Sequence, residues 1–404
     1  MGEQLYQISV FDILSEPFKI DKPVRLIELF AGIGSQAKAL QRLGADFEHY
    51  RVCEFDKYAI KSYNAIHGTD FATSDITGIT ATDLGIVGTD KYCYIMTYSF
   101  PCQDLSLAGK QKLMAKGSGT RSSLLWEVER LLNECEHLPQ VLLMENVTQV
   151  HGKKNKEHFD EWIKFLESKG YSNYWQDLNA KGFGIPQNRN RTFMVSVLGD
   201  YTYEFPKEFP LELRLKDMLE DSVDEKFYIK DFDSLTAIND EYLMINGGVV
   251  GKMHDVSRRV YLEGGTSPTI HTCGGGNTEP KIIEDFYKNR GERIYEGIAP
   301  TLRSERRGLK VSEPLALDEQ NGYVRKCGTV GTLTTDGSSP KHNNRVIEGG
   351  RVRKLTPLEC YRLMGFDDED FHKASQLNSN SQLYKQAGNS IVVDVLYYIF
   401  KQMY

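Results

Sequence analysis

Residues 24–44, VRLIELFAGIGSQAKALQRLG, have the pattern of a buried strand, a glycine-containing turn and an amphipathic helix. The same alternation continues to residue 200, through the strand-like runs YRVCEF, YCYIMTY, VLLMEN and TFMVSVL and the helix-like runs between them. Apolar strands separated by amphipathic helices are typical of a parallel sheet covered on both faces. The sequence therefore predicts an α/β fold with a doubly wound, mostly parallel sheet over this part of the chain.

The bulk composition is that of a soluble globular protein with two domains. The chain has 404 residues, of which 40% are hydrophobic and 26% charged. Its first residues, MGEQLYQISVFDIL, carry no secretory signal, and no apolar run is long enough to cross a membrane. Seven cysteines without a CxxC pair argue against both a zinc site and a disulfide framework. We expect a cytoplasmic protein with reduced thiols and no bound metal.

The composition changes after about residue 245. Residues 246–350 hold 17 of the 35 glycines and contain three copies of the pattern G-x-x-[PG]-T-[IL]-x-[TS], which begin at Gly265, Gly297 and Gly328. Each copy has the pattern of a turn that leads into a short strand, which predicts a small β-rich domain. Residues 251–354 carry a net charge of +5 and the rest of the chain −12. This balance is compatible with a polyanionic partner, although ordinary scatter of surface charge produces a similar one.

The last sixty residues recover helical periodicity, in LTPLECYRLMGF and NSIVVDVLYYIFKQMY. We expect them to return to the first domain. The predicted organisation is a first part of the α/β domain at 1–200, a connecting segment at 201–245, the small domain at 246–350 and the returning part at 351–404.

A nucleoside site is predicted where the first two strands end. Gly32 and Gly34 allow a tight turn and close approach of a ligand, although such turns also use glycine for geometry alone. Glu54, at the end of the second strand, can accept both ribose hydroxyls. Phe55 can lie against an adenine ring, and Asp75 is placed for its amino group. No GxxxxGK[ST] motif is present, which favours a nucleoside without phosphates.

Chemically reactive groups follow at the ends of later strands. SFPCQDLS, residues 99–106, places Cys102 directly after a proline, and VLLMENV ends its strand with Glu145. QNRNR adds Arg189 and Arg191, which could hold the carboxylate, fix a base carbonyl or lower the pKa of the thiol. Taken singly, each has a structural alternative: a buried thiol that only fills space, a surface charge at a strand end, and ordinary ion pairs.

Taken together and in this order, the stretches resemble one family, the DNA cytosine-5 methyltransferases that use S-adenosyl-L-methionine. The resemblance rests on ELFAGIGS, CEFD, SDIT, SFPCQDLS, TRSSLLWE, MENV, QNRNR, RKLTPLECYRLMGF and QAGNSIVVDV, and it covers residues 25–200 and 350–404. The surroundings of SFPCQ are similar to a bacterial branch that includes CpG-reading enzymes. Glu28 stands where the family usually has Asp, and Ser35 where Gly is common.

The resemblance implies a Rossmann-like methyltransferase fold with residues 246–350 as an inserted target-recognition domain. It implies a monomeric enzyme of a bacterial or phage-infected cell that acts on double-stranded DNA, with a cognate restriction endonuclease as a separate partner where one exists. The cofactor would be S-adenosyl-L-methionine, without a metal. In the family mechanism the Cys102 thiolate adds to carbon 6 of a flipped-out cytosine, Glu145 holds ring nitrogen 3 and the amino group, and residues 109–122 close as a loop.

The implied site residues fall into three groups. They are the catalytic Cys102, Glu145, Arg189 and Arg191; the cofactor-binding Phe30, Gly32, Gly34, Glu54, Phe55, Asp75, Ile76, Pro101, Leu124, Asn389 and Ser390; and the DNA-binding Gln103, Thr301, Arg303, Arg306 and Arg307.

Two other readings share much of this pattern. A tRNA cytosine-5 methyltransferase has the same catalytic motifs, but that branch usually carries a CFT tripeptide, absent from this sequence, and a small variable region. The basic insertion of about 100 residues favours duplex DNA. A non-catalytic DNA-binding relative is the second alternative, and the presence of every group that the reaction needs argues against it.

Overall fold

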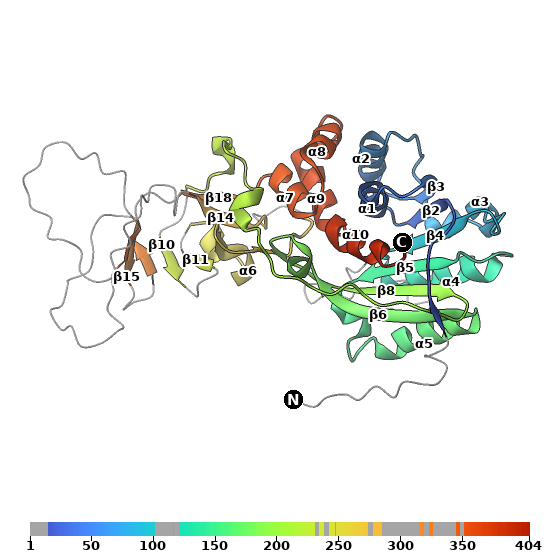
Figure 1. Cartoon of the computed structure of the whole chain (residues 1–404). Helices are drawn as coiled ribbons and strands as arrows, with labels where there is room; N and C mark the ends of the chain where they lie inside the picture. The colour runs from blue at the N-terminus through green and yellow to red at the C-terminus, as the bar shows by residue number, and fades with distance from the viewer. Residues whose placement is uncertain are drawn as a thin grey trace, which may run out of the picture. The chain divides into compact units, whose positions relative to one another are not determined.

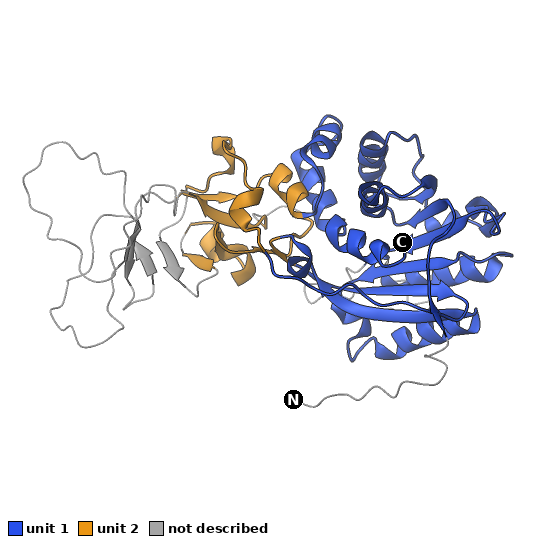
Figure 2. Cartoon of the chain, viewed as in Figure 1, with its two compact units in different colours: residues 1–185, 189–211, 364–404 blue, residues 186–188, 212–363 orange. Residues whose placement is uncertain are grey.

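The protein forms two compact units, shown in blue and orange in Figure 2. The first comprises residues 1–185, 189–211 and 364–404, and the second residues 186–188 and 212–363. The computed structural model describes residues 15–101, 116, 122–230, 242–245, 248–273, 278–284 and 351–404, and the backbone alone of 121, 234–237, 246, 315–318, 323–325 and 345–347.

The first unit is built on a six-stranded sheet with the order β3-β2-β4-β5-β8-β6. β3, β2, β4 and β5 are parallel, and β8 runs antiparallel to both of its neighbours. This confirms the predicted α/β fold with a mostly parallel sheet. The strands are β2 (Val24–Leu29), β3 (Phe47–Cys53), β4 (Cys93–Tyr98), β5 (Val141–Asn146), β6 (Tyr171–Asn179) and β8 (Asn190–Leu198).

Helices cover both faces of this sheet (Figure 1). Alternate side chains of the strands, among them Met96 and Leu142, form one apolar core with α4 and α5. The opposite face carries Glu28 and Thr97, which are paired in register on β2 and β4, and it is covered by α1, α2 and α10. The helices are α1 (Ser35–Leu43), α2 (Lys57–His67), α3 (Ala81–Leu84), α4 (Leu125–Glu134), α5 (Lys156–Ser168), α8 (Asp368–Ser375), α9 (Asn380–Asn389) and α10 (Val393–Lys401).

The second unit contains an eight-stranded sheet with the order β17-β15-β16-β10-β11-β12-β14-β18. Its core in the described residues includes Ile245, Val260, Ile283 and Val352. The elements are β10 (Ser234–Ala237), β11 (Tyr242–Asn246), β12 (Arg259–Leu262), β14 (Lys281–Glu284), β15 (Leu315–Asp318), β16 (Tyr323–Arg325), β17 (Arg345–Ile347), β18 (Arg351–Lys354), α6 (Asp255–Arg258) and α7 (Pro357–Leu363).

The boundaries of the second unit differ from the segment that the sequence suggested. The unit also takes in residues 212–245 and 351–363, so the chain returns to the first unit at Met364. The reason is a long-range strand pairing, since β18 runs antiparallel to β14 with Val352 opposite Ile283.

Short strand pairs complete the two units. In the first, β1 (Glu16–Pro17) pairs with β9 (Tyr201–Thr202). In the second, the repeat that begins at Gly265 contributes β13 (Ser267–Pro268), which pairs with β7 (Gln187–Asn188). The other two repeats, at 297–304 and 328–335, lie outside the described residues.

A buried ion pair fixes β18 and α7 within the second unit. Arg353 and Glu359 are both fully buried, and the guanidinium donates two hydrogen bonds to the carboxylate, at 2.6 and 2.7 Å. Arg353 Nε also donates to Glu284 on β14. The Glu359 carboxylate further accepts from the backbone N–H groups of Thr356 and Glu220, at 2.8 and 2.9 Å. Arg353 and Glu359, the first and last residues of the motif RKLTPLE, therefore form a charge network that joins four segments of one unit.

Arg353→Ala is expected to lower the free energy of unfolding of the second unit by about 3–5 kcal/mol, because it leaves a buried carboxylate without its cation. Urea unfolding followed by the fluorescence or circular dichroism of the whole chain measures this. Arg351→Ala is the matched control, because Arg351 pairs with Glu225 at the surface and its loss should change little. Equal destabilisation by the two substitutions would contradict this assignment.

Candidate active site

The turn after β2 has an unusual backbone conformation. Phe30, Gly32 and Gly34 all have positive φ, at 58°, 58° and 82°. Such a φ is rare for a phenylalanine, and backbone strain of this kind tends to occur at functional sites. At Gly34 a Cβ atom would lie 2.2 Å from Nε2 of His67, so no larger residue fits there. The turn therefore brings bare backbone to the carboxyl end of the sheet, where doubly wound folds bind nucleotides.

Glu54 closes one side of this turn. Its carboxylate is mostly buried and accepts hydrogen bonds from the backbone N–H groups of Gly32 and Asp56, at 2.8 and 2.7 Å. Burial raises the pKa of the Glu54 carboxyl, and these two bonds partly offset the effect. Each carboxylate oxygen has a second lone pair, so the group retains capacity for hydroxyl donors. The adjacent Phe55 is 77% exposed, the largest exposure among the exposed large apolar side chains described.

Asp75 lies next to Glu54 because the two segments are hydrogen-bonded. The Ser74 N–H donates to Glu54 O at 2.9 Å, and the Cys53 thiol donates to Ser74 O at 3.6 Å. Asp75 Oδ1 accepts from the N–H of Thr77 and so caps the short turn Ile76–Gly78, in which Ile76 is buried.

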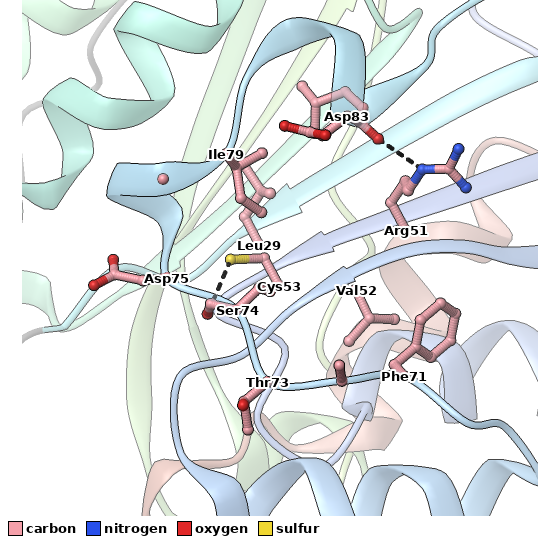
Figure 3. A pocket seen from close by; sticks show the side chains of 13 residues that line it. Leu29, Arg51, Val52, Cys53, Phe71, Thr73, Ser74, Asp75, Ile79 and Asp83 are labelled. Carbon is pink, nitrogen blue, oxygen red and sulfur yellow. Dashed lines mark hydrogen bonds between the residues drawn. The ribbon is translucent and has the colours of Figure 1, made fainter.

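A cavity of about 500 Å³ opens beside this segment (Figure 3). Its walls are mostly apolar and include Leu29, Cys53, Ile79 and Asp75, with Arg51 and Asp83 joined by a hydrogen bond on one side. Neither Glu54 nor Phe55 lines it, so the cavity borders the predicted adenine position at Asp75 without coinciding with the whole predicted nucleoside site.

The segment 388–391 is held beside the turn after β2. The Ile391 N–H donates to Ser35 Oγ at 3.3 Å, so the hydroxyl at position 35 contacts the returning chain directly. Asn389 is exposed, whereas Ser390 is buried and its hydroxyl donates to Gln386 O at 2.7 Å. These contacts place both predicted residues of the GNS stretch near the first strand end.

Arg189 and Arg191 have different partners. The Arg189 guanidinium is buried and donates to the carbonyl oxygens of Gly388 and Ser390, at 3.1 and 2.7 Å. Arg191 Nε lies 3.3 Å from Glu145 Oε1. These contacts place Arg191 at the carboxylate and Arg189 at the segment that carries Asn389.

Glu145 is a buried carboxylate at the end of β5. Burial raises its pKa, and the positive charges of Arg191 and Arg189 act in the opposite direction. A carboxyl in this environment keeps a proton to a higher pH than an exposed one does.

Two residues that the sequence reasoning did not single out fix the backbone before Cys102. Asn146 Nδ2 donates to Phe100 O at 3.0 Å, and Ser122 Oγ donates to Pro101 O at 2.9 Å. Both lie in stretches already noted, MENV and TRSSLLWE, but their roles depend on contacts with another strand end. Asn146 holds the end of β4 against the end of β5, and Ser122 ties it to the turn 121–124, in which Leu124 packs on the core.

Several predicted residues lie outside the described part of the chain. They are Cys102 and Gln103, most of the expected loop 109–122, and Thr301, Arg303, Arg306 and Arg307. Among the residues that are described, no three His, Cys, Asp or Glu side chains are arranged to hold a metal ion. Within the same residues, no helix is long and apolar enough to cross a membrane.

The chain is similar over nearly its whole length to proteins of known class. The family model "C-5 cytosine-specific DNA methylase" matches residues 24–404. Type II methyltransferase M2.ScrFI of Lactococcus lactis subsp. cremoris is 31% identical over 94% of this chain and 99% of its own. Orphan methyltransferase M.SPBetaI of Bacillus phage SPbeta is 30% identical over 94% of this chain and 97% of its own.

Solved structures share the fold. The methyltransferase EhMeth of Entamoeba histolytica gives a TM-score of 0.61 at 16% identity, covering 95% of this chain and 98% of that one. The Dnmt2 methyltransferase of S. pombe gives 0.59 at 18% identity, covering 94% and 97%. With the family match and the relatives above, these findings establish the class: the chain belongs to the C-5 cytosine-specific DNA methylases and is a DNA cytosine-5 methyltransferase.

Arg189→Ala should speed amide hydrogen exchange at residues 390–393 by roughly ten- to a hundred-fold, the loss expected for hydrogen bonds from a charged donor. Mass spectrometry of peptides that span this segment measures the rate. Arg191→Ala, two residues along the same chain segment, is the control and should leave these amides unchanged. If both variants exchange at the wild-type rate, Arg189 does not hold the segment.

Proposed function

We propose that the protein transfers a methyl group from S-adenosyl-L-methionine to carbon 5 of a cytosine flipped out of duplex DNA, through a covalent Cys102 adduct. The observation that carries the proposal is the pair of strand ends at β4 and β5. There the backbone before Cys102 is fixed by Asn146, and the buried Glu145 is paired with Arg191.

The residues around the turn after β2 fit this cofactor. Glu54 retains acceptor capacity for the ribose hydroxyls, and the exposed ring of Phe55 offers a stacking surface for adenine. The bare backbone at Gly32, with open space where a side chain would stand, allows the methionine part to approach closely. The proposed pocket is completed by Phe30, Gly34, Asp75, Ile76, Pro101, Leu124, Asn389 and Ser390. When bound, the cofactor supplies an electrophilic methyl group on sulfur.

Cys102 activates the base, because carbon 5 of cytosine is too weak a nucleophile by itself. The thiolate forms a bond to carbon 6, and the displaced π electrons make carbon 5 nucleophilic. After carbon 5 has gained the methyl group, it loses its proton, the electrons return to the ring, and the carbon–sulfur bond breaks to release Cys102.

Glu145 would handle the charge that develops as the thiolate adds. A carboxyl whose pKa is raised by burial can hold a proton toward ring nitrogen 3, while its other oxygen accepts from the exocyclic amino group. Arg191 keeps this carboxyl oriented and is placed to contact the base carbonyl. Arg189 serves the same reaction from a distance, by holding the chain at Ser390.

The choice of DNA sequence is assigned to residues 246–350. The catalytic stretches lie before and after this segment and supply chemistry that every substrate shares. Gln103, Thr301, Arg303, Arg306 and Arg307 are proposed to contact DNA, since arginine suits both guanine edges and phosphates.

Bisulfite sequencing of plasmid from cells that express the protein tests the activity, and it should reveal methylated cytosines in one short sequence context. A duplex with 5-fluorocytosine at that site should then trap the protein covalently in the presence of cofactor, because the fluorine cannot leave as a proton does. Cys102→Ser should abolish both methylation and trapping while binding cofactor normally. Trapping by the serine variant would exclude Cys102 as the nucleophile, and methylation confined to RNA would favour the tRNA alternative.

Glu54→Ala should weaken the binding of S-adenosyl-L-methionine by about 1–3 kcal/mol, the cost of leaving buried hydroxyls without an acceptor. Isothermal titration calorimetry measures the affinity. Glu48→Ala, a substitution at an exposed carboxylate on β3, the strand that Glu54 follows, serves as the comparison. Unchanged affinity in the Glu54 variant would place the ribose elsewhere.

A further inference from the structure

A fully buried carboxylate lies beneath the turn 30–34 and is not used by the proposed chemistry. Glu28, on β2, is 0% exposed. Its Oε1 accepts from the Ala37 N–H of α1 at 3.3 Å, and its Oε2 accepts from the Tyr63 hydroxyl of α2 at 2.5 Å. The Tyr63 oxygen also lies 2.8 Å from Nδ1 of His49 on β3. Three elements that surround the turn therefore meet at one side chain.

This cluster holds the turn from below. α1 begins after Gly34 and has no side-chain cap, so its first N–H groups need acceptors from elsewhere. Glu28 supplies one of them from the sheet, and its negative charge faces the positive end of the helix dipole. On the neighbouring side, Nε2 of His67 lies 3.0 Å from Ile33 O and fills the space over Gly34.

Within the described residues, the groups that donate to Glu28 are neutral, in contrast to Glu145 with its arginine. Burial is the main reason that the Glu28 pKa rises to about 7, against the opposing effect of the Tyr63 and Ala37 hydrogen bonds. Burial also lowers the pKa of His49, and that of His67 to about 3, so neither ring is the cation that Glu28 lacks near neutral pH.

The remaining charged groups lie farther out. Lys38 of α1 and Lys373 of α8 act electrostatically on His67. Lys38 is itself paired with Asp367 and Asp370, at 2.8 and 2.7 Å. Thr97 of β4, in register with Glu28, is not ionisable.

We propose that Glu28 is a positioning residue for the cofactor: its ionised carboxylate holds the start of α1 and the turn 30–34 in the binding geometry, and protonation of this carboxylate weakens cofactor binding. When Oε2 is protonated, the carboxyl donates a hydrogen bond to the Tyr63 oxygen, and the Tyr63 hydroxyl then donates toward Nδ1 of His49 instead of toward Glu28. The charge that faced the helix N-terminus is lost at the same time. The inference rests on the proposed use of S-adenosyl-L-methionine.

The sign of the pH dependence follows from this pKa. Above about pH 7 Glu28 is ionised and cofactor binds most tightly. As the pH falls below that value the carboxyl takes up a proton in the free protein, and the affinity should fall by at most about tenfold per pH unit for a single proton.

Isothermal titration calorimetry with S-adenosylhomocysteine between pH 6 and 8.5 tests the inference, in two buffers of different ionisation enthalpy to count released protons. The wild type should bind more weakly below pH 7 and release protons on binding. Glu28→Gln should bind more weakly than the wild type at pH 8. Below pH 7 it should lose less affinity than the wild type does, and it should release fewer protons on binding. Tyr63→Phe removes a hydrogen bond that lowers the Glu28 pKa, so the midpoint should move to higher pH.

Glu48→Gln makes the same carboxyl-to-amide change at an exposed position on β3 and should keep the wild-type profile. Glu54, whose pKa is also raised, is present in every variant, so differences between variants report Glu28. Binding by Glu28→Gln with the wild-type pH profile, or an unmoved midpoint in Tyr63→Phe, would overturn the inference alone. Failure of the wild type to bind at any pH would instead overturn the proposed cofactor, and the inference with it.

Discussion

The hydrogen bond from Asn146 Nδ2 to Phe100 O, at 3.0 Å, joins the two strand ends on which the proposed chemistry depends. β4 and β5 are parallel, so they end at the same edge of the sheet, but pairing alone does not fix the chain beyond the last ladder bond. Asn146 and the hydroxyl of Ser122 donate to the carbonyl oxygens of the two residues that precede Cys102, and so fix the backbone beyond the end of β4. Glu145 stands one position before Asn146, so one short segment both carries the carboxylate and places the neighbouring strand end.

Three buried carboxylates lie at this edge, and each is compensated differently. Glu54 accepts backbone N–H groups, which keeps the turn at Gly32 close to the second strand. Glu145 has Arg191 and so retains a charged partner within the site. Glu28 receives only neutral donors in the described residues, and burial raises its pKa to about 7 although the Tyr63 and Ala37 hydrogen bonds lower it. The same residue type therefore serves three purposes, and the partner decides which one.

Much of the first unit could be predicted from the sequence, because its strands are continuous apolar runs and its helices are amphipathic. The order of the motifs also placed Glu54 and Glu145 at strand ends, and the structure has Glu54 directly after β3 and Glu145 as the last residue but one of β5, whereas Asp75 precedes the short turn Ile76–Gly78. The separate partners of Arg189 and Arg191 could not be predicted, since Arg189 bonds to Ser390, 201 residues away, and Arg191 pairs with a carboxylate at the end of another strand. The boundary at Met364 was missed for a related reason: the pairing of β18 with β14 is long-range and leaves no local pattern. The roles assigned to the site residues stay predictions.

The first repeat shows how position alters the meaning of a motif. Its Thr269 hydroxyl donates to Asn188 O at 2.7 Å, and the N–H of Ile270 lies 3.3 Å from Oε1 of Gln187. This copy is thus occupied in bonding to the chain just before Arg189. A segment that reads DNA needs free polar groups, so the Thr269 hydroxyl and the Ile270 N–H of this copy are not available for that role.

The path of the chain between the two units limits how this protein can be recombined. The backbone passes from one unit to the other at residues 185/186, 188/189, 211/212 and 363/364. An exchange of the whole second unit with a relative would therefore need two separate pieces of sequence, one of them only three residues long. Breakpoints inside the eight-stranded sheet that keep Arg353 with Glu359 and β18 with β14 break fewer contacts of the second unit. Because residues 246–350 are proposed to choose the DNA sequence, new specificities are expected to arise by replacement of segments inside the second unit, with β14 and β18 inherited together.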